Sequence, residues 1–146
     1  SRWSTVLACA LGMDNTRRLR ALGAQYPLYA AIYDAASSAL IESAVGHLDS
    51  MVQDAASAAG LSCNWRFSCG YGDCPLEAQG RLLASLDATR RIGLTVTPTN
   101  LMVPSKSVSA MIGVFEGPPR AADAPARCAI CRMRASCSMR KRGTTC

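Results

Sequence analysis

Two groups of residues in this sequence have the types and spacing to do chemistry. The first is the turn at residues 66–75 (RFSCGYGDCP). Arg66 could hold a carboxylate through two parallel hydrogen bonds, Gly70 would let backbone N–H groups approach a ligand closely, and Tyr71 offers a flat ring and a hydroxyl. The set predicts a site for an amino-acid-like or nucleoside-like ligand. The alternative is an ordinary strand–turn–helix corner with a solvated Arg66.

The second group is a cysteine cluster in the C-terminal tail. Its spacing is Cys128-x2-Cys131-x5-Cys137-x8-Cys146. A Cys-x2-Cys turn brings two thiolates within reach of one metal ion, and two further cysteines complete a tetrahedral sulfur site. Iron–sulfur clusters use the same ligands, and the flanking arginines favour thiolates. The tail therefore predicts an iron–sulfur cluster or zinc at these four residues, with disulfides or free thiols as the alternative.

Two more cysteines flank the predicted ligand turn. Cys69 and Cys74 have four residues between them. Buried thiols that serve only as small apolar side chains are the commoner case, so the sequence favours that interpretation. The spacing is also compatible with a redox pair, which is the alternative.

Charge and composition exclude several classes of protein. The net charge is +6, and basic and acidic residues are equal in number before residue 124, so the tail carries the excess. No apolar run approaches the roughly 18 residues of a membrane span, and no signal peptide is visible. We expect a cytoplasmic protein with reduced cysteines and no membrane partner. The basic tail suits anions or acidic surfaces, but it lacks aromatic residues for stacking on bases, so a nucleic acid partner is not expected.

The elements that position these residues follow from periodicity and turn signals. Strands are predicted at 5–11, 61–68, 93–97 and 108–115, a long helix at 27–60 and another helix at 75–90. Alternation in strand 61–68 places Cys63 on the apolar face and Arg66 on the polar face. The prediction is an α+β fold, a twisted antiparallel sheet with long helices, over residues 1–117. A linker (118–126) and a cysteine-rich knuckle (127–146) follow.

Two motifs in the same order resemble a known family. Arg66-x3-Gly70-Tyr71, followed by Cys-Pro and a helix, looks like one signature of the activation domain of cobalamin-dependent methionine synthases. The stretch 94–109 (LTVTPTNLMVPSKSVS) resembles the second signature. The similarity runs from about residue 5 to residue 137, and the closest match is to short, free-standing members with a C-terminal cysteine cluster. The resemblance also implies that an N-terminal part of the family's domain is missing.

The resemblance implies particular site residues. Arg66 would bind the carboxylate of S-adenosylmethionine, with Gly70 and Tyr71 as further contacts. Glu42 resembles a family glutamate near the same pocket and would suit the ligand's ammonium group; the alternative is an exposed helical acid. Lys106 would face an anionic ligand or the corrinoid, unless it is simply a solvated lysine.

The activity that the resemblance implies is reductive methylation. Cob(II)alamin on a partner protein accepts one electron, and the cob(I)alamin takes a methyl group from S-adenosylmethionine. The chain would be an accessory domain that positions the donor for a methyltransferase. Its partners would be a cobalamin-binding methionine synthase or another corrinoid protein, and an electron donor such as flavodoxin or ferredoxin. The alternative function is an electron-transfer or docking module with an iron–sulfur or zinc site in the cysteine tail.

Overall fold

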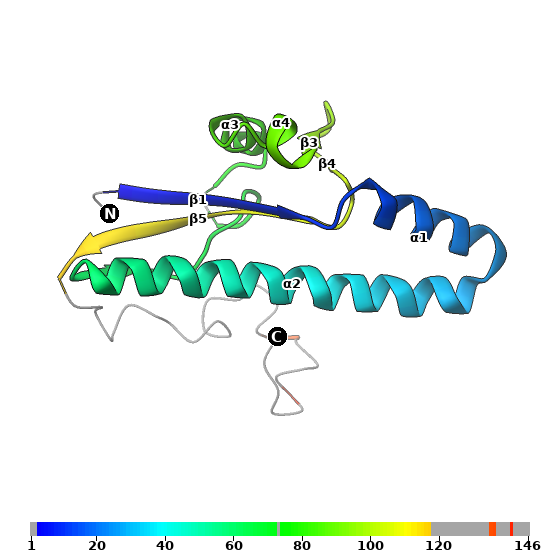
Figure 1. The fold of residues 1–146 in the computed structure, drawn as a ribbon, viewed down its shortest axis with the longest axis horizontal. Coiled ribbons are helices and arrows are strands. Elements are labelled where there is room, and N and C mark those ends of the chain that lie inside the picture. The colour runs from blue at the N-terminus through cyan, green and yellow to red at the C-terminus, as the bar shows by residue number, and fades with distance from the viewer. Residues whose placement is uncertain (1–2, 73, 118–134, 137–140, 142–146) are drawn as a thin grey trace.

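The fold combines a small antiparallel sheet with a long helix, as predicted for an α+β protein (Figure 1). A computed structural model describes residues 3–72, 74–117, 135–136 and 141. The linker and all four tail cysteines predicted as metal ligands lie outside these residues. The structure therefore bears on the predicted ligand turn and leaves the metal prediction untested.

Nine elements make up the described part of the chain. They are β1 (Trp3–Ala10), α1 (Met13–Gln25), α2 (Pro27–Ala58), β2 (Leu61–Cys63), α3 (Ala78–Ser85), α4 (Ala88–Ile92), β3 (Thr95–Val96), β4 (Met102–Val103) and β5 (Ser107–Glu116). The strand order β1-β5-β2 puts the last strand at the centre of the sheet, and β3 and β4 pair as a separate ribbon. The central strand β5 therefore follows α3 and α4 in the sequence.

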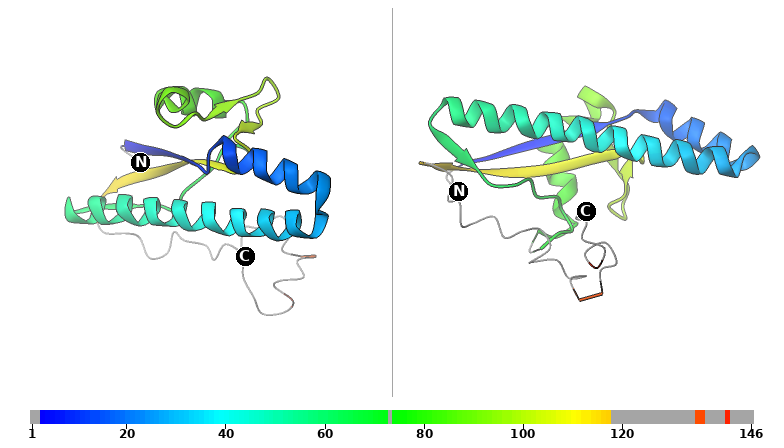
Figure 2. Two further views of the ribbon diagram at one scale, coloured as in Figure 1. Left: turned by 45° about the vertical axis from the view of Figure 1, so that its right-hand side comes forward. Right: turned by 90° about the horizontal axis from the view of Figure 1, so that it is seen from below.

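Each face of the sheet carries its own hydrophobic cluster. On one face Ala110 and Ile112 of β5 pack with Ile41 and Val45 of α2. On the other face Met111 packs against the layer formed by α3, α4 and the β3–β4 ribbon. The views in Figures 1 and 2 show α2 along one side of the sheet and this smaller layer along the other. The alternation follows from the two-residue period of a strand.

The first half of α2 leaves the sheet and pairs with α1 as a helical hairpin (Figure 1). Pro27 occupies the first turn of α2, where its missing N–H costs nothing. Leu28 and Ile32 lie four residues apart, as apolar residues on the buried face of a helix do, but 71% and 60% of their surfaces are exposed. The face that α1 covers instead includes the small, polar Ser37, which is buried. Apolar periodicity was therefore misleading in this half of the helix.

Three differences from the predicted elements go beyond a shift of one or two residues at an end. The predicted helix 75–90 is divided into α3 and α4, because Asp87 adopts a left-handed conformation at φ 51°. Residues 98–107, which separate two predicted strands, contain β4, and the predicted strand 61–68 ends as β2 at Cys63. No helix in the described ranges has both the length and the apolarity that crossing a membrane requires.

Candidate functional site

The segment after β2 carries a one-residue bulge. Along β2, Cys63 lies opposite Val114 of β5, but four residues later Phe67 lies opposite Met111, only three residues from Val114. The Asn64 backbone N–H donates to the Gly113 carbonyl at 3.1 Å, and the Asn64 Oδ1 accepts from the Gly113 N–H at 2.7 Å. An asparagine side chain thus takes the place of a backbone carbonyl in the ladder. Such an extra residue bends a strand and re-aims its side chains.

The bulge reverses the faces predicted for this segment. Cys63 packs in the cluster under α2, whereas Phe67 pairs with Met111, whose side chain packs on the opposite face. A slip of one residue moves every following side chain to the other side of a sheet. Arg66 therefore lies on the α2 side, together with Cys63, and the predicted placement of these two residues on opposite faces is wrong.

Arg66 forms an ion pair with Glu42 of α2. Its Nη2 donates to Glu42 Oε2 at 2.6 Å. The Arg66 side chain is only 21% exposed, while that of Glu42 is 59% exposed. The structure thus brings together two residues that the sequence predicts for one site. An ion pair with an exposed partner contributes little free energy, so the sheltered guanidinium could exchange its partner at small cost.

Gly70 and Tyr71 lie in the turn that follows. Gly70 has a φ of 89°, a region that glycine enters without strain. Its N–H donates to the Cys74 carbonyl at 2.9 Å, and the Tyr71 N–H donates to the Ser68 carbonyl at 3.2 Å. The Tyr71 side chain projects outward, with 71% of the residue's surface exposed. The turn is therefore held by its own backbone and presents an aromatic ring to solvent.

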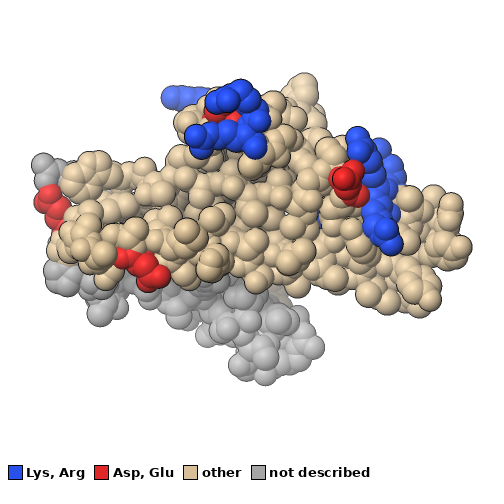
Figure 3. All heavy atoms as spheres, in the orientation of Figure 1, with Lys and Arg blue, Asp and Glu red and all other residues tan. Residues whose placement is uncertain are grey.

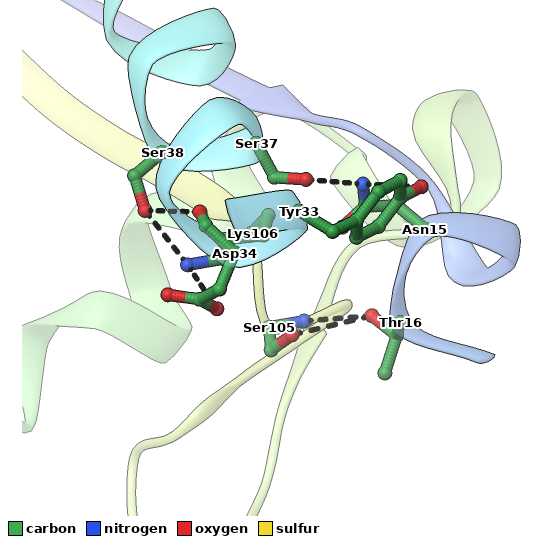
Figure 4. Close-up of polar contacts among 8 residues, drawn as sticks. All are labelled: Asn15, Thr16, Tyr33, Asp34, Ser37, Ser38, Ser105 and Lys106. Atoms are coloured by element: carbon green, nitrogen blue, oxygen red, sulfur yellow. Dashed lines mark hydrogen bonds and ion pairs between the residues drawn. The ribbon is translucent and has the colours of Figure 1, made fainter. Parts of the chain in front are cut away.

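Lys106 lies on the loop between β4 and β5 and makes contacts with α2 that are separate from the Arg66–Glu42 ion pair. Its Nζ donates to the Asp34 carboxylate and to the Ser38 hydroxyl, each at 2.8 Å (Figure 4). The side chain of Lys106 is 16% exposed, whereas that of Asp34 is 49% exposed, so the sheltered ammonium meets a half-exposed carboxylate. In the same view Ser105 contacts Thr16 of α1. This loop is thus anchored to both helices of the hairpin.

Asp34, Ser38 and Glu42 follow one another at intervals of one helical turn along α2, and we call them the docking row. Residues four apart in a helix lie on the same side, so the row spans about 12 Å. Lys106 binds its first two members and Arg66 binds the third. Two cations from distant loops therefore reach the same side of α2.

The two cysteines at the ends of the turn lie side by side. Their sulfur atoms are 3.6 Å apart, within hydrogen-bonding distance. Cys69 is buried with leucines of α3, whereas Cys74 is partly exposed. Burial, reinforced by the neighbouring Cys74 thiol, raises the pKa of Cys69 to about 11. Cys69 is therefore a protonated thiol at neutral pH.

Charged side chains collect elsewhere on the surface. The face in Figure 3 shows basic groups over α1 and over the α3–α4 layer, separated by uncharged surface. The residues of α1 that contribute are the exposed Arg17, Arg18 and Arg20. Across the described residues, no three His, Cys, Asp or Glu side chains converge as metal ligands would.

Comparison of the sequence with protein-family models and with curated proteins finds no match. Asn64, whose side chain builds the bulge, and the docking-row residues Asp34 and Ser38 were not predicted from the sequence. Asparagine is uncommon within strands, and this is the one signal in the sequence that could have marked Asn64. No sequence signal pairs Lys106 with a helix 68 residues away.

Proposed function

We propose that the chain is an activation-type domain that binds S-adenosylmethionine for a corrinoid methyltransferase, as the two motif resemblances suggest. The amino-acid end of the ligand would bind at Arg66 and Glu42. The finer fold assignment, to the architecture of methionine synthase activation domains with an added cysteine knuckle, is part of the same proposal. The three-stranded antiparallel sheet with one long helix is compatible with it.

The ion pair between Arg66 and Glu42 is the observation that carries the proposal. The amino-acid end of S-adenosylmethionine is a zwitterion with a carboxylate and an ammonium group on the same carbon, and the Arg66–Glu42 pair offers one partner of opposite charge for each. The carboxylate would take hydrogen bonds from the sheltered guanidinium, which has donors beyond the one that Glu42 uses. The ammonium group of the ligand would pair with the carboxylate of the exposed Glu42. The ligand thus replaces one ion pair by two, and no charge is left without a partner.

Tyr71 would supply a contact for the rest of the ligand. Its ring is already exposed, so contact with an aromatic base or a sulfonium requires no rearrangement of a core. Gly70 would shape the turn through its positive φ. Contrary to the expectation from the sequence, it would not offer its own N–H to the ligand, because that group already donates to the Cys74 carbonyl and Leu76 lies against the glycine. None of these residues would need to act as a general acid or base, because their proposed role is to bind and orient the methyl donor.

In this role the methyl group passes from S-adenosylmethionine to the partner's corrinoid after a one-electron reduction. Electron donors such as flavodoxin or ferredoxin, a cobalamin-binding methionine synthase and other corrinoid proteins are the proposed partners. The chain itself would contribute binding and orientation, and so would support a methyltransferase without being one.

Calorimetry with two ligands tests the proposal. S-adenosylmethionine and methylthioadenosine share the thioadenosine part, but methylthioadenosine lacks the amino-acid end. We expect the intact protein to bind S-adenosylmethionine and to bind methylthioadenosine at least tenfold more weakly, which corresponds to about 1.4 kcal/mol. Absence of S-adenosylmethionine binding, with the corrinoid partner also present, would remove the methyl-donor role. Equal affinity for the two ligands would remove the role of the ion pair.

A further inference from the structure

We propose that Cys69 and Cys74 form a redox-active dithiol, which closes reversibly into a disulfide by exchange with an external disulfide. The site lies next to the proposed ligand turn and does not depend on the proposed function. It assigns a chemical activity to two cysteines for which the activation-domain role has no use.

The geometry favours a bond between these two residues. The sulfur atoms lie 3.6 Å apart, and a disulfide needs about 2 Å. The backbone already closes the turn between them, because Gly70 N–H donates to the Cys74 carbonyl and Cys74 N–H to the Tyr71 carbonyl. Bond formation therefore orders little additional chain. The other free cysteines in the described residues, Cys9 and Cys63, pack on the opposite face of the sheet and cannot compete.

The difference in exposure sets the order of the two steps. Cys74 is partly exposed, so an incoming disulfide can reach its sulfur. Cys69 is 6% exposed and sits among Leu82, Leu83 and Leu94, where an external reagent has no access. The raised pKa of Cys69 also keeps its thiolate fraction small at neutral pH, which disfavours it as the first nucleophile. Cys74 is therefore the attacking residue and Cys69 the resolving residue.

The chemistry balances with a disulfide R–S–S–R as oxidant. The Cys74 thiolate attacks one of its sulfur atoms, which forms a mixed disulfide at Cys74 and releases one R–S⁻. Cys69 then attacks the Cys74 sulfur while its proton passes to the departing sulfur, which forms the Cys69–Cys74 bond and releases R–SH. Two protein thiols are oxidised, and one external disulfide is reduced to two thiols. A dithiol reductant reverses both steps.

The disulfide would constrain the turn that carries Gly70 and Tyr71. These two residues lie between the cysteines, so the new bond closes a short ring around them. Oxidation would thereby limit the conformations that the Tyr71 ring can sample. The redox state of the pair would then influence any ligand that uses this turn.

Peptide mapping tests the pair directly, without any ligand. Trypsin cleavage after Arg66 and Arg81 releases peptide 67–81, which contains both cysteines and no other. The full chain is equilibrated in glutathione buffers of increasing oxidised-to-reduced ratio, quenched in acid, alkylated in denaturant and digested. We expect peptide 67–81 to lose both alkyl groups and appear two hydrogens lighter than the dithiol. Peptides 3–17 and 21–66, with Cys9 and Cys63, remain alkylated as internal controls.

Single variants test the order of the steps. Cys69→Ser should accumulate a glutathione mixed disulfide at Cys74, because the resolving thiol is gone. Cys74→Ser should leave Cys69 alkylated, since the buried thiol is not reached. The proposal is overturned if peptide 67–81 in the wild-type chain stays doubly alkylated at every ratio. It is also overturned if its cysteines bond to the tail cysteines, or if the two variants take up glutathione equally.

Discussion

The guanidinium of Arg66 forms an ion pair with the carboxylate of Glu42 because the segment from Cys63 to Phe67 contains one residue more than the segment of β5 that it faces. Without that bulge, regular alternation would point Arg66 at the α3–α4 layer and away from α2. The ion pair is thus a consequence of strand register, and the register depends on the side chain of Asn64.

The first prediction concerns the bulge. Replacing Asn64 by Ala removes the acceptor for the Gly113 N–H, which lies in the central strand of the sheet. We expect Asn64→Ala to lower the free energy of unfolding by about 1–3 kcal/mol, the usual cost of a buried donor left without a partner. Urea denaturation measures it. Asn64→Asp keeps the Oδ1 acceptor and is the matched control; an equal loss in both variants would contradict the role given to this hydrogen bond.

The second prediction concerns the β4–β5 loop. Lys106→Met removes the charge that holds the loop to Asp34 and Ser38 while keeping most of the side chain. We expect a loss of about 1–2 kcal/mol in unfolding free energy, because the lysine is largely sheltered. Arg17→Met is the control, since the Arg17–Asp14 pair is 72% and 95% exposed and should contribute almost nothing. Equal effects of the two substitutions would count against the docking row as a stabilising contact.

The third prediction follows from the raised pKa of Cys69. In the unfolded chain the thiol ionises near its ordinary value of 9.0, whereas in the folded protein burial raises the pKa to about 11. Between these values the unfolded chain has already lost the proton that the folded chain keeps, so stability falls as pH rises. Urea denaturation from pH 8 to about pH 11 should show this decline, and it should be weaker in Cys69→Ala. Parallel pH profiles for the two proteins would contradict the raised pKa.

The fourth prediction concerns the tail, which lies outside the described residues. If Cys128, Cys131, Cys137 and Cys146 hold an iron–sulfur cluster or zinc, anaerobically prepared protein should contain that metal, with sulfide only for a cluster. The double variant Cys128→Ala/Cys131→Ala should lose it. Cys69→Ala/Cys74→Ala should retain it, because those cysteines belong to the turn. Metal-free protein, or metal retained by the first variant, would exclude the predicted tail site.

Much of the fold could be predicted from local patterns. Pro27 and Gly60 bracket the long helix as their backbone preferences suggest, and the alternating stretch 108–115 lies within β5. The predictions from the sequence were wrong where the burial of a residue depends on which other element packs against it. Leu28 and Ile32 have helical spacing but are exposed, whereas Asn15 of α1 donates to the hydroxyl groups of Tyr33 and Ser37, and apolar periodicity gives no signal for such polar contacts.

The candidate site, like the fold, could be predicted from the sequence only in part. The turn motif singled out Arg66, and Glu42 was expected only from the family resemblance; the structure brings the two together. Their geometry could not be predicted, because it depends on a register change that one hydrogen-bonding side chain produces. The contact of Lys106 with Asp34 joins segments far apart in the sequence, and only the assembled hairpin and loop create it.

We proposed that Arg66 binds the carboxylate of an amino-acid ligand. Titration calorimetry with S-adenosylmethionine is the sharpest test of this role. Wild-type protein should bind, and Arg66→Ala should lose about 2–5 kcal/mol of binding free energy, as expected for a sheltered charge that loses its partner. Arg17→Ala, which removes an exposed arginine of α1, should bind like the wild type. Unchanged affinity in Arg66→Ala would contradict the claim.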